Sequence, residues 1–143
     1  MAKLVIRNWR EGNQALHIIL DAIKAKHIEK SRIRMVISNS SSSAYARIWG
    51  LQKIFQVAYK MPAAYVIEVI WPRFFKMKCR DKISVLLHEL AHIPENFSGG
   101  LRPHTKKFYD TYNLFVERLE KKLRADPDLR DRLCLLLEEG SDL

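Results

Sequence analysis

The chain has 143 residues, of which 48% are hydrophobic, and carries a formal net charge of +9. A chain of this length can bury its own core, so we expect a single domain over residues 1–143. It contains no apolar run of the roughly 18 residues that a membrane span needs, and residues 1–10 lack the long apolar core of a signal peptide. We therefore predict a cytoplasmic protein without a membrane partner.

The positive charge is concentrated in the first part of the chain. Residues 1–82 carry 16 Lys and Arg against 5 Asp and Glu, a net charge of +11, whereas residues 83–143 carry 9 against 11, a net charge of −2. A one-sided basic surface attracts phosphate backbones and acidic partners. Lysine and arginine also simply solvate helix faces, and no nucleic-acid-binding motif decides between the two interpretations. DNA is therefore one candidate partner.

Residues 13–30 predict an amphipathic helix, because apolar side chains recur there at helical spacing, and Asn13 would suit its N-cap. Two histidines lie in this segment. His17 and His27 are ten residues apart, nearly three helical turns, so they cannot bind one ion without distortion. We interpret both as surface or boundary residues.

About three strands are expected next. Residues 32–38 and 44–49 alternate their side chains with the period of a strand, whereas residues 51–59 fit either a short helix or a strand. The strongest strand is residues 64–71, which are β-branched and aromatic and are followed by a proline.

Tyr45, Arg47 and Trp49 share one face of the second predicted strand. Sheet packing with an arginine that extends to solvent is the favoured interpretation of this face. Stacking of nucleic-acid bases on the two aromatic rings is the alternative.

The most informative segment is His88-Glu-Leu-Ala-His92. Two histidines four residues apart leave the same face of a helix and can bind one metal ion. The carboxylate beside the first, Glu89, stays off the metal and is free to take a proton from a water that the metal activates. An apolar stripe before the motif and Pro94 after it predict a two-turn helix. The alternative is a pair of partly buried helix histidines beside a surface glutamate.

A catalytic zinc site needs a third protein ligand. His104 is the preferred candidate, because two adjacent glycines in the preceding loop permit the tight reversal that brings it back. A ligand six residues after the second histidine is excluded, since that position is Ser98. Glu117 or Glu120 on a later helix remain alternatives, and His104 could instead be a polar residue that opens the next helix.

Two helices are expected after the metal segment. Residues 105–124 carry an apolar stripe at helical spacing, and a last helix opens at Asp126-Pro127 and ends at Gly140. Cys79 and Cys134 lie far apart in the sequence without metal-ligand spacing or a disulfide framework, so we interpret both as ordinary thiols. The fold class is then α+β, with an N-terminal helix, about three mainly antiparallel strands, the HExxH helix and two C-terminal helices.

The motif belongs to a longer segment, HELAHIPENFSGGLRPHTKKFYD, that resembles the metal-binding segment of small metallopeptidases from archaea and phages. That family is related in style to SprT-like and Wss-type proteases, in which HExxH is followed by a loop and a histidine that leads into a helix with an aromatic residue four positions on. Here that aromatic residue is Phe108. The resemblance covers about residues 33–112, although the loop differs in length from that of SprT-like and Wss-type proteins.

The resemblance implies a minimal zincin fold, one Zn²⁺ per chain held by three histidines, and a general base. The implied ligands are His88, His92 and His104, and the base is Glu89. It also implies a metalloprotease that acts on a protein or peptide, and its SprT-like character points to DNA-associated substrates.

Three further residues are candidates for supporting roles. Arg102 and Tyr109 lie close enough in sequence to donate a hydrogen bond to a developing oxyanion. Glu68, an unusual carboxylate inside a strand, is expected to pair with an arginine or to be exposed, and the alternative is that it orients a zinc-binding histidine. The alternative function is a non-catalytic, zinc-stabilised module that binds nucleic acid or protein. The oligomeric state is not predicted.

Overall fold

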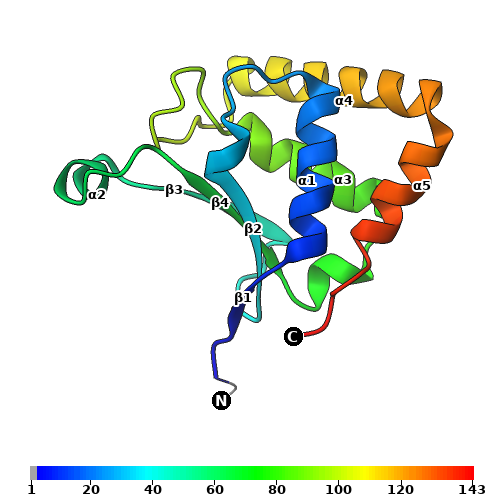
Figure 1. The fold of residues 1–143 in the computed structure, drawn as a ribbon, viewed down its shortest axis with the longest axis horizontal. Coiled ribbons are helices and arrows are strands. Elements are labelled where there is room, and N and C mark those ends of the chain that lie inside the picture. Colours follow the sequence, from blue (N-terminus) through cyan, green and yellow to red (C-terminus); the bar gives the residue numbers. More distant parts are fainter. Residues whose placement is uncertain (1–2) are drawn as a thin grey trace.

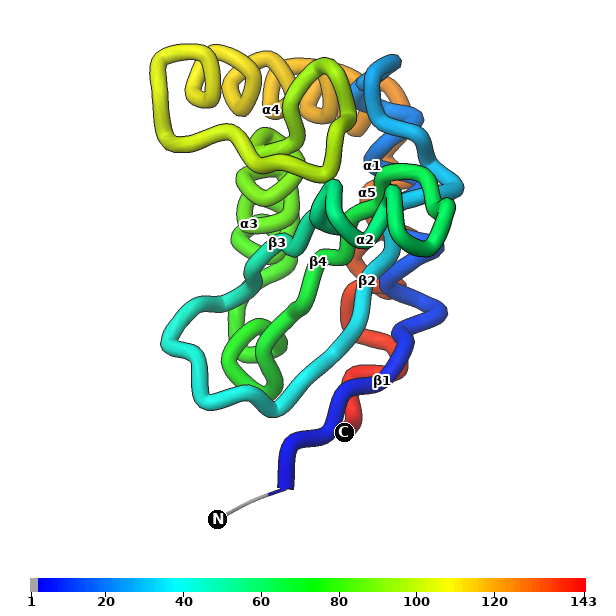
Figure 2. The backbone as a smooth tube through the Cα atoms, turned by 90° about the vertical axis from the view of Figure 1, so that its left-hand side faces the viewer, coloured from blue at the N-terminus to red at the C-terminus, as the bar shows by residue number. Residues whose placement is uncertain are grey.

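The computed structural model describes residues 3–143, which form five α-helices, two short 3₁₀ helices and one four-stranded sheet. The larger helices lie together on one face of the sheet, and the other face is left open, as Figures 1 and 2 show from two directions. The predicted α+β class is confirmed. Within the described residues, no helix is both long enough and apolar enough to cross a bilayer.

The sheet is mixed, and two of its three strand pairings are antiparallel, in line with the prediction of a mainly antiparallel sheet. Its strands, in spatial order, are β1 (Ile6–Asn8), β2 (Ile33–Ser38), β4 (Tyr65–Ile70) and β3 (Ala46–Gly50). The two outer strands run antiparallel to their neighbours, whereas β2 and β4 pair in parallel, with Ile33 opposite Tyr65. The three-strand prediction missed β1, because three residues are too few to show a period. It also missed the insertion of β4 between β2 and β3, since side-chain alternation carries no information on strand order.

Helix α1 (Arg10–Ile23) packs its apolar stripe against the inner face of the sheet. It begins three residues before the expected start and ends where Lys24 adopts a left-handed conformation. Asn13 is therefore not the N-cap. Its side chain instead donates to the Trp9 carbonyl at 2.9 Å and accepts from the Met35 N–H at 2.8 Å, which ties α1 to β2.

Helices α3 (Cys79–Ala91), α4 (Lys106–Ala125) and α5 (Pro127–Leu136) complete the helical layer. Thr105 caps α4 and Asp126 caps α5, with side chains that accept from the N–H three residues on. The last helix ends earlier than predicted and is followed by a turn that reaches Gly140. The 3₁₀ helices are η1 (Lys30–Arg32) and η2 (Arg73–Lys76).

The prediction that the two cysteines are ordinary thiols is wrong. Cys79 and Cys134 form a disulfide that links the first residue of α3 to α5 across 55 residues of sequence. Figure 1 shows that the folded chain brings α5 back beside α3. The distance of two cysteines along the sequence does not reveal that they lie close together in the fold.

The ambiguous segment before the strongest strand is a short helix, α2 (Lys53–Ala58). It lies beyond one end of the sheet and projects from the body of the molecule (Figure 1).

Candidate metal centre

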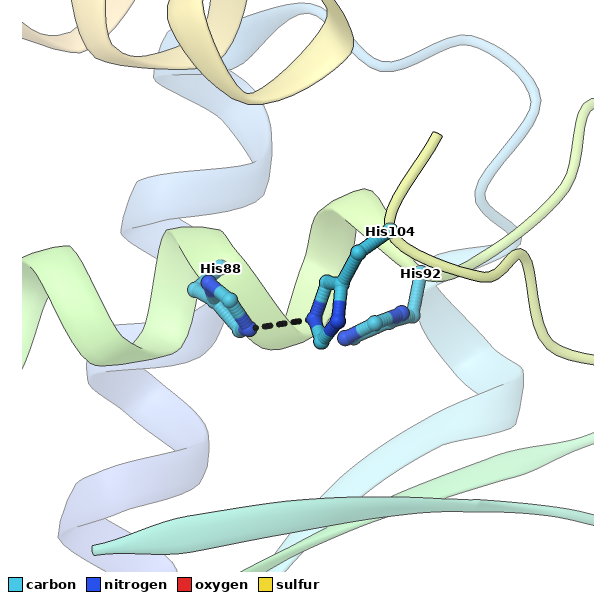
Figure 3. A group of neighbouring side chains, drawn as sticks. All are labelled: His88, His92 and His104. Carbon is cyan, nitrogen blue, oxygen red and sulfur yellow. Dashed lines mark hydrogen bonds between the residues drawn. The ribbon is translucent and has the colours of Figure 1, made fainter. Parts of the chain in front are cut away.

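Three histidines from two parts of the chain converge at the end of α3. His88 lies in the last turn of α3, His92 follows directly after the helix in a helical conformation, and His104 comes from the loop that precedes α4. Figure 3 shows the three imidazole rings pointing toward one another. One ring nitrogen from each histidine lies within 4.8 Å of the other two. The local i, i+4 pair is thus joined by a third donor from sixteen residues away.

The spacing of these nitrogens suits a small metal ion. The Nε2 atoms of His88 and His104 are 3.1 Å apart. A tetrahedral zinc ion with Zn–N bonds of about 2.0–2.1 Å separates its ligand atoms by about 3.3–3.4 Å. For this pair, only a small adjustment of the rings would therefore be needed to reach the separation of two zinc ligands.

The orientation of His92 is set by the loop that follows it. Its Nδ1 lies 2.6 Å from the carbonyl oxygen of Arg102, and the Arg102 N–H donates to the His92 carbonyl at 2.6 Å. A neutral His92 that donates from Nδ1 leaves the lone pair of Nε2 free for a metal.

Electrostatics favours the neutral, metal-binding form of two of these histidines. Burial is the main cause that lowers the pKa of His88, and the neighbouring His92 and His104 lower it further. Burial also lowers the pKa of His92, although the hydrogen bond to Arg102 opposes that effect. Neutral imidazole is the form that binds metal ions, so the surroundings prepare these side chains for coordination.

A buried aromatic ring forms the floor of the cluster. The Phe108 ring centroid lies 4.9 Å from that of His88, 4.5 Å from that of His92 and 4.8 Å from that of His104. Phe108 is fully buried on the first turns of α4, so it joins the metal cluster to the core. This is the aromatic residue that the resemblance singled out.

Glu89 lies next to His88 on α3 and its side chain is almost completely buried, with 8% of the residue exposed. Burial raises the pKa of its carboxyl to about 7, and a backbone hydrogen bond from Ile48 partly opposes this rise. Ile48 belongs to β3, which is an edge strand of the sheet. The carboxylate therefore lies between the helix that carries the histidines and the edge of the sheet.

The two predicted oxyanion donors are placed differently. The Arg102 guanidinium donates to the Thr111 hydroxyl at 3.0 Å and to the Ala91 carbonyl at 3.4 Å, so its visible contacts are with the scaffold. The Tyr109 ring stacks beside that of His104 at a centroid distance of 6.2 Å and is 51% exposed. Of the two, Tyr109 lies at the rim of the cluster.

Glu68 lies on the open face of the sheet, away from the helical layer. Its carboxylate accepts from Arg47 Nε at 2.7 Å, from Trp49 Nε1 at 2.9 Å and from the Ser38 hydroxyl. Burial alone would raise the pKa of Glu68, but these hydrogen bonds outweigh burial and hold the pKa below its ordinary value. The structure thus shows the arginine pairing, and its described hydrogen bonds reach no histidine.

Two buried side chains that sequence reasoning did not single out hold the loop between His92 and His104. The Tyr65 hydroxyl accepts from the Gly99 N–H and donates to the Gly100 carbonyl, both at 2.8 Å. Gln56 Nε2 donates to the carbonyls of Leu51 at 2.7 Å and Ser98 at 2.8 Å. Gly99 has a φ of 94°, which side-chain-bearing residues rarely adopt. No spacing rule links these residues to the metal motif.

The alternative ligands lie elsewhere. Glu120 on α4 pairs with Arg124 at 4.0 Å, and Glu117 is exposed on the same helix. Within residues 3–143, the His, Cys, Asp and Glu side chains close enough to hold a metal ion together are His88, His92 and His104. His17 is exposed on α1, as expected, and His27 stacks on Phe115.

An α+β fold in which an HExxH helix meets a third histidine is the arrangement of a metallopeptidase. A family model described as "Putative phage metallopeptidase" matches residues 2–125 of the chain. The chain belongs to this family, and a family of peptidases implies a protein or peptide substrate. Comparison with curated proteins and with solved structures gives no match.

Proposed function

We propose that the protein is a zinc-dependent metallopeptidase that hydrolyses peptide bonds. The observation that carries this proposal is the convergence of three histidine nitrogens within 4.8 Å of one another beside the buried Glu89. Three protein ligands leave a fourth position of a tetrahedral ion open, as catalytic zinc sites do and structural sites do not. Membership of a metallopeptidase family supports the same reaction class.

In this proposal each residue has one role. His88, His92 and His104 would hold one ion per chain through neutral imidazole nitrogens. Bound zinc would lower the pKa of a water molecule and polarise the scissile carbonyl. Glu89 would take the proton from the attacking water and pass it to the leaving amine. Tyr109 would donate to the developing oxyanion, whereas Arg102 would first have to release Thr111.

The free edge of β3 offers a place for an extended substrate. β3 pairs with β4 on one side, and no other described strand lies on its other side. β3 packs against α3, the helix that carries Glu89, and the Ile48 backbone acts to lower the pKa of the Glu89 carboxyl, so the edge runs beside the proposed base. A peptide that adds to this edge would gain backbone hydrogen bonds with little dependence on its sequence.

Nucleic-acid binding is a second candidate function, either with proteolysis of DNA-associated proteins or as the sole activity of a non-catalytic, zinc-stabilised module. The open face of the sheet favours it. Arg34, Arg47 and Trp49 lie there, and the Arg47 guanidinium lies 5.0 Å from the centre of the Trp49 ring. The resemblance of the metal segment to SprT-like proteases also favours this role. Proteolysis that becomes faster when single-stranded DNA is added would support it.

We retain a cytoplasmic location and a single domain over residues 1–143 as proposals. The Cys79–Cys134 disulfide makes the location testable, because the cytosol keeps thiols reduced. Cells would be lysed in the presence of an alkylating agent, which modifies free thiols before they can oxidise. Protein from the cytosol should then carry two alkylated cysteines.

The deciding experiment combines metal content and turnover. Elemental analysis of untagged protein is expected to find one zinc per chain in the wild type and little in His104→Ala. Glu89→Gln should keep its zinc but lose hydrolysis of fluorescently labelled casein. His17→Ala is the matched control, because this histidine is exposed on α1, and it should keep both properties. Zinc retained in His104→Ala, or full activity in Glu89→Gln, would overturn the assignment.

A further inference from the structure

Helix α2 has the reverse of the polarity expected for a surface helix. Its polar Gln56 is buried, with 8% exposed, whereas Ile54 and Val57 are 71% and 68% exposed. Phe55 in the helix, and Tyr59 and Met61 directly after it, are also exposed. We call the five exposed apolar residues the α2 tip: Ile54, Phe55, Val57, Tyr59 and Met61.

The orientation of α2 is imposed by hydrogen bonds. Gln56 Nε2 donates to the carbonyls of Leu51 and Ser98, so the polar side of the helix is held against the rest of the protein. At about 100° per residue, Ile54, Phe55 and Val57 then occupy the arc on the other side. The fold therefore presents this apolar arc to the surroundings, and Figure 1 shows α2 projecting beyond the sheet.

We propose that the α2 tip inserts into the surface of a lipid bilayer that contains anionic lipids. A projecting helix with a broad apolar arc and flanking lysines is suited to the interface between head groups and acyl chains. Lys53 precedes the tip and Lys60 lies between Tyr59 and Met61, and Tyr59 carries the amphipathic ring that such interfaces favour. Insertion of this kind is peripheral, so it needs no spanning helix.

Charge supports an anionic lipid surface. The segment from residue 39 to residue 67 contains Arg47, Lys53 and Lys60 and no Asp or Glu. Each lysine or arginine near an anionic bilayer adds to the attraction. A second copy of the chain is the less favourable occupant, because two α2 tips would bring their lysines together in a protein whose net charge is already +9.

The position of α2 relates the tip to the metal centre. Gln56 bonds Ser98 in the loop that leads to His104, so a bilayer bound at the tip would lie near this loop. If the proposed function also holds, and this step rests on it, the accessible substrates would be proteins at the membrane surface. The proposal departs from the expectation, drawn from the sequence, that membranes are not partners.

The test is co-sedimentation of the full chain with vesicles, which requires no catalytic activity. Vesicles of equal parts phosphatidylcholine and phosphatidylglycerol are expected to bind the wild type, and vesicles of phosphatidylcholine alone to bind it weakly. The double variant Ile54→Ser/Val57→Ser should bind the mixed vesicles at least about tenfold more weakly, because two inserted apolar side chains are lost. Leu114→Ser/Leu135→Ser is the matched control, since both leucines are exposed on other helices, and it should bind like the wild type.

Three outcomes would overturn the proposal. The first is the absence of binding to the mixed vesicles. The second is equal binding by the wild type and the Ile54→Ser/Val57→Ser variant when circular dichroism shows that both are folded, which would leave only general charge attraction. The third is a wild-type dimer in analytical ultracentrifugation that this variant dissociates, which would identify a second copy as the occupant. A failure of zinc binding or of casein hydrolysis would bear on the proposed function alone.

Discussion

The Cys79–Cys134 disulfide allows a quantitative prediction, because it closes a long segment that contains the whole metal centre. Constraining a loop of 55 residues removes entropy from the unfolded chain worth about 4 kcal/mol at 25 °C. Cys134→Ser should therefore lower the free energy of unfolding by up to about 4 kcal/mol. For a chain of this size, the corresponding fall in Tm is about 10–15 °C.

The same substitution should leave the metal centre intact. Cys79 opens α3, and His88 lies nine residues further along the helix, which places it about 14 Å away at 1.5 Å per residue. Zinc content and casein hydrolysis at 25 °C should then match those of the wild type. An effect on stability without an effect on the site is the expected signature.

The assay is thermal unfolding, monitored by circular dichroism, with and without a reductant. The wild type in reductant should unfold at the Tm of Cys134→Ser, and the variant should not respond to reductant. Cys79→Ser and the double variant should match Cys134→Ser, since the bond is lost only once. A reduced wild type that keeps the Tm of the oxidised protein would refute the reasoning.

Three further predictions concern single buried side chains. Tyr65→Phe removes the hydroxyl that holds the metal loop and should cost about 1–2 kcal/mol of stability and weaken zinc binding in competition with a chelator. Burial lowers the pKa of Lys82, so the protonated side chain destabilises the folded state at pH 7. Lys82→Met should therefore raise the free energy of unfolding at pH 7 by roughly 1 kcal/mol. This gain should shrink as the pH rises toward 10, because Lys82 of the wild type then loses its proton in the folded state. Hydrogen bonds hold the pKa of Glu68 below 4.5, so the stability it contributes is present above that pH and is lost as the pH falls through the folded pKa. Glu68→Gln should cost about 2 kcal/mol at pH 7 and flatten the loss of stability below pH 4.5 in urea titrations, whereas a variant as stable as the wild type at pH 7 would contradict the pairing with Arg47.

The features that could be predicted from the sequence are those that depend on local spacing. The i, i+4 pair of His88 and His92 could be placed on one helix face, because a helix has the same geometry wherever it occurs. The same argument predicted α1 and α4 from their apolar stripes, and the long strand β4 from its β-branched residues. His104 was a candidate because the glycines before it permit a reversal.

The remaining features needed the tertiary structure, because they join residues whose separation along the chain follows no rule. The pairing of Cys79 with Cys134, the parallel alignment of β2 with β4 and the clamp from Tyr65 to the metal loop all bring together segments far apart in sequence.

Helix α2 shows the same limit in another form. From the sequence, residues 51–59 fit either a short helix or a strand. Even for a helix, periodicity gives only the relative positions of its faces. Which face turns toward the protein was decided by the hydrogen bonds of Gln56 to Leu51 and Ser98. The sequence by itself determined the chemistry of the metal-binding helix, and only the fold decided which distant side chains complete and support it.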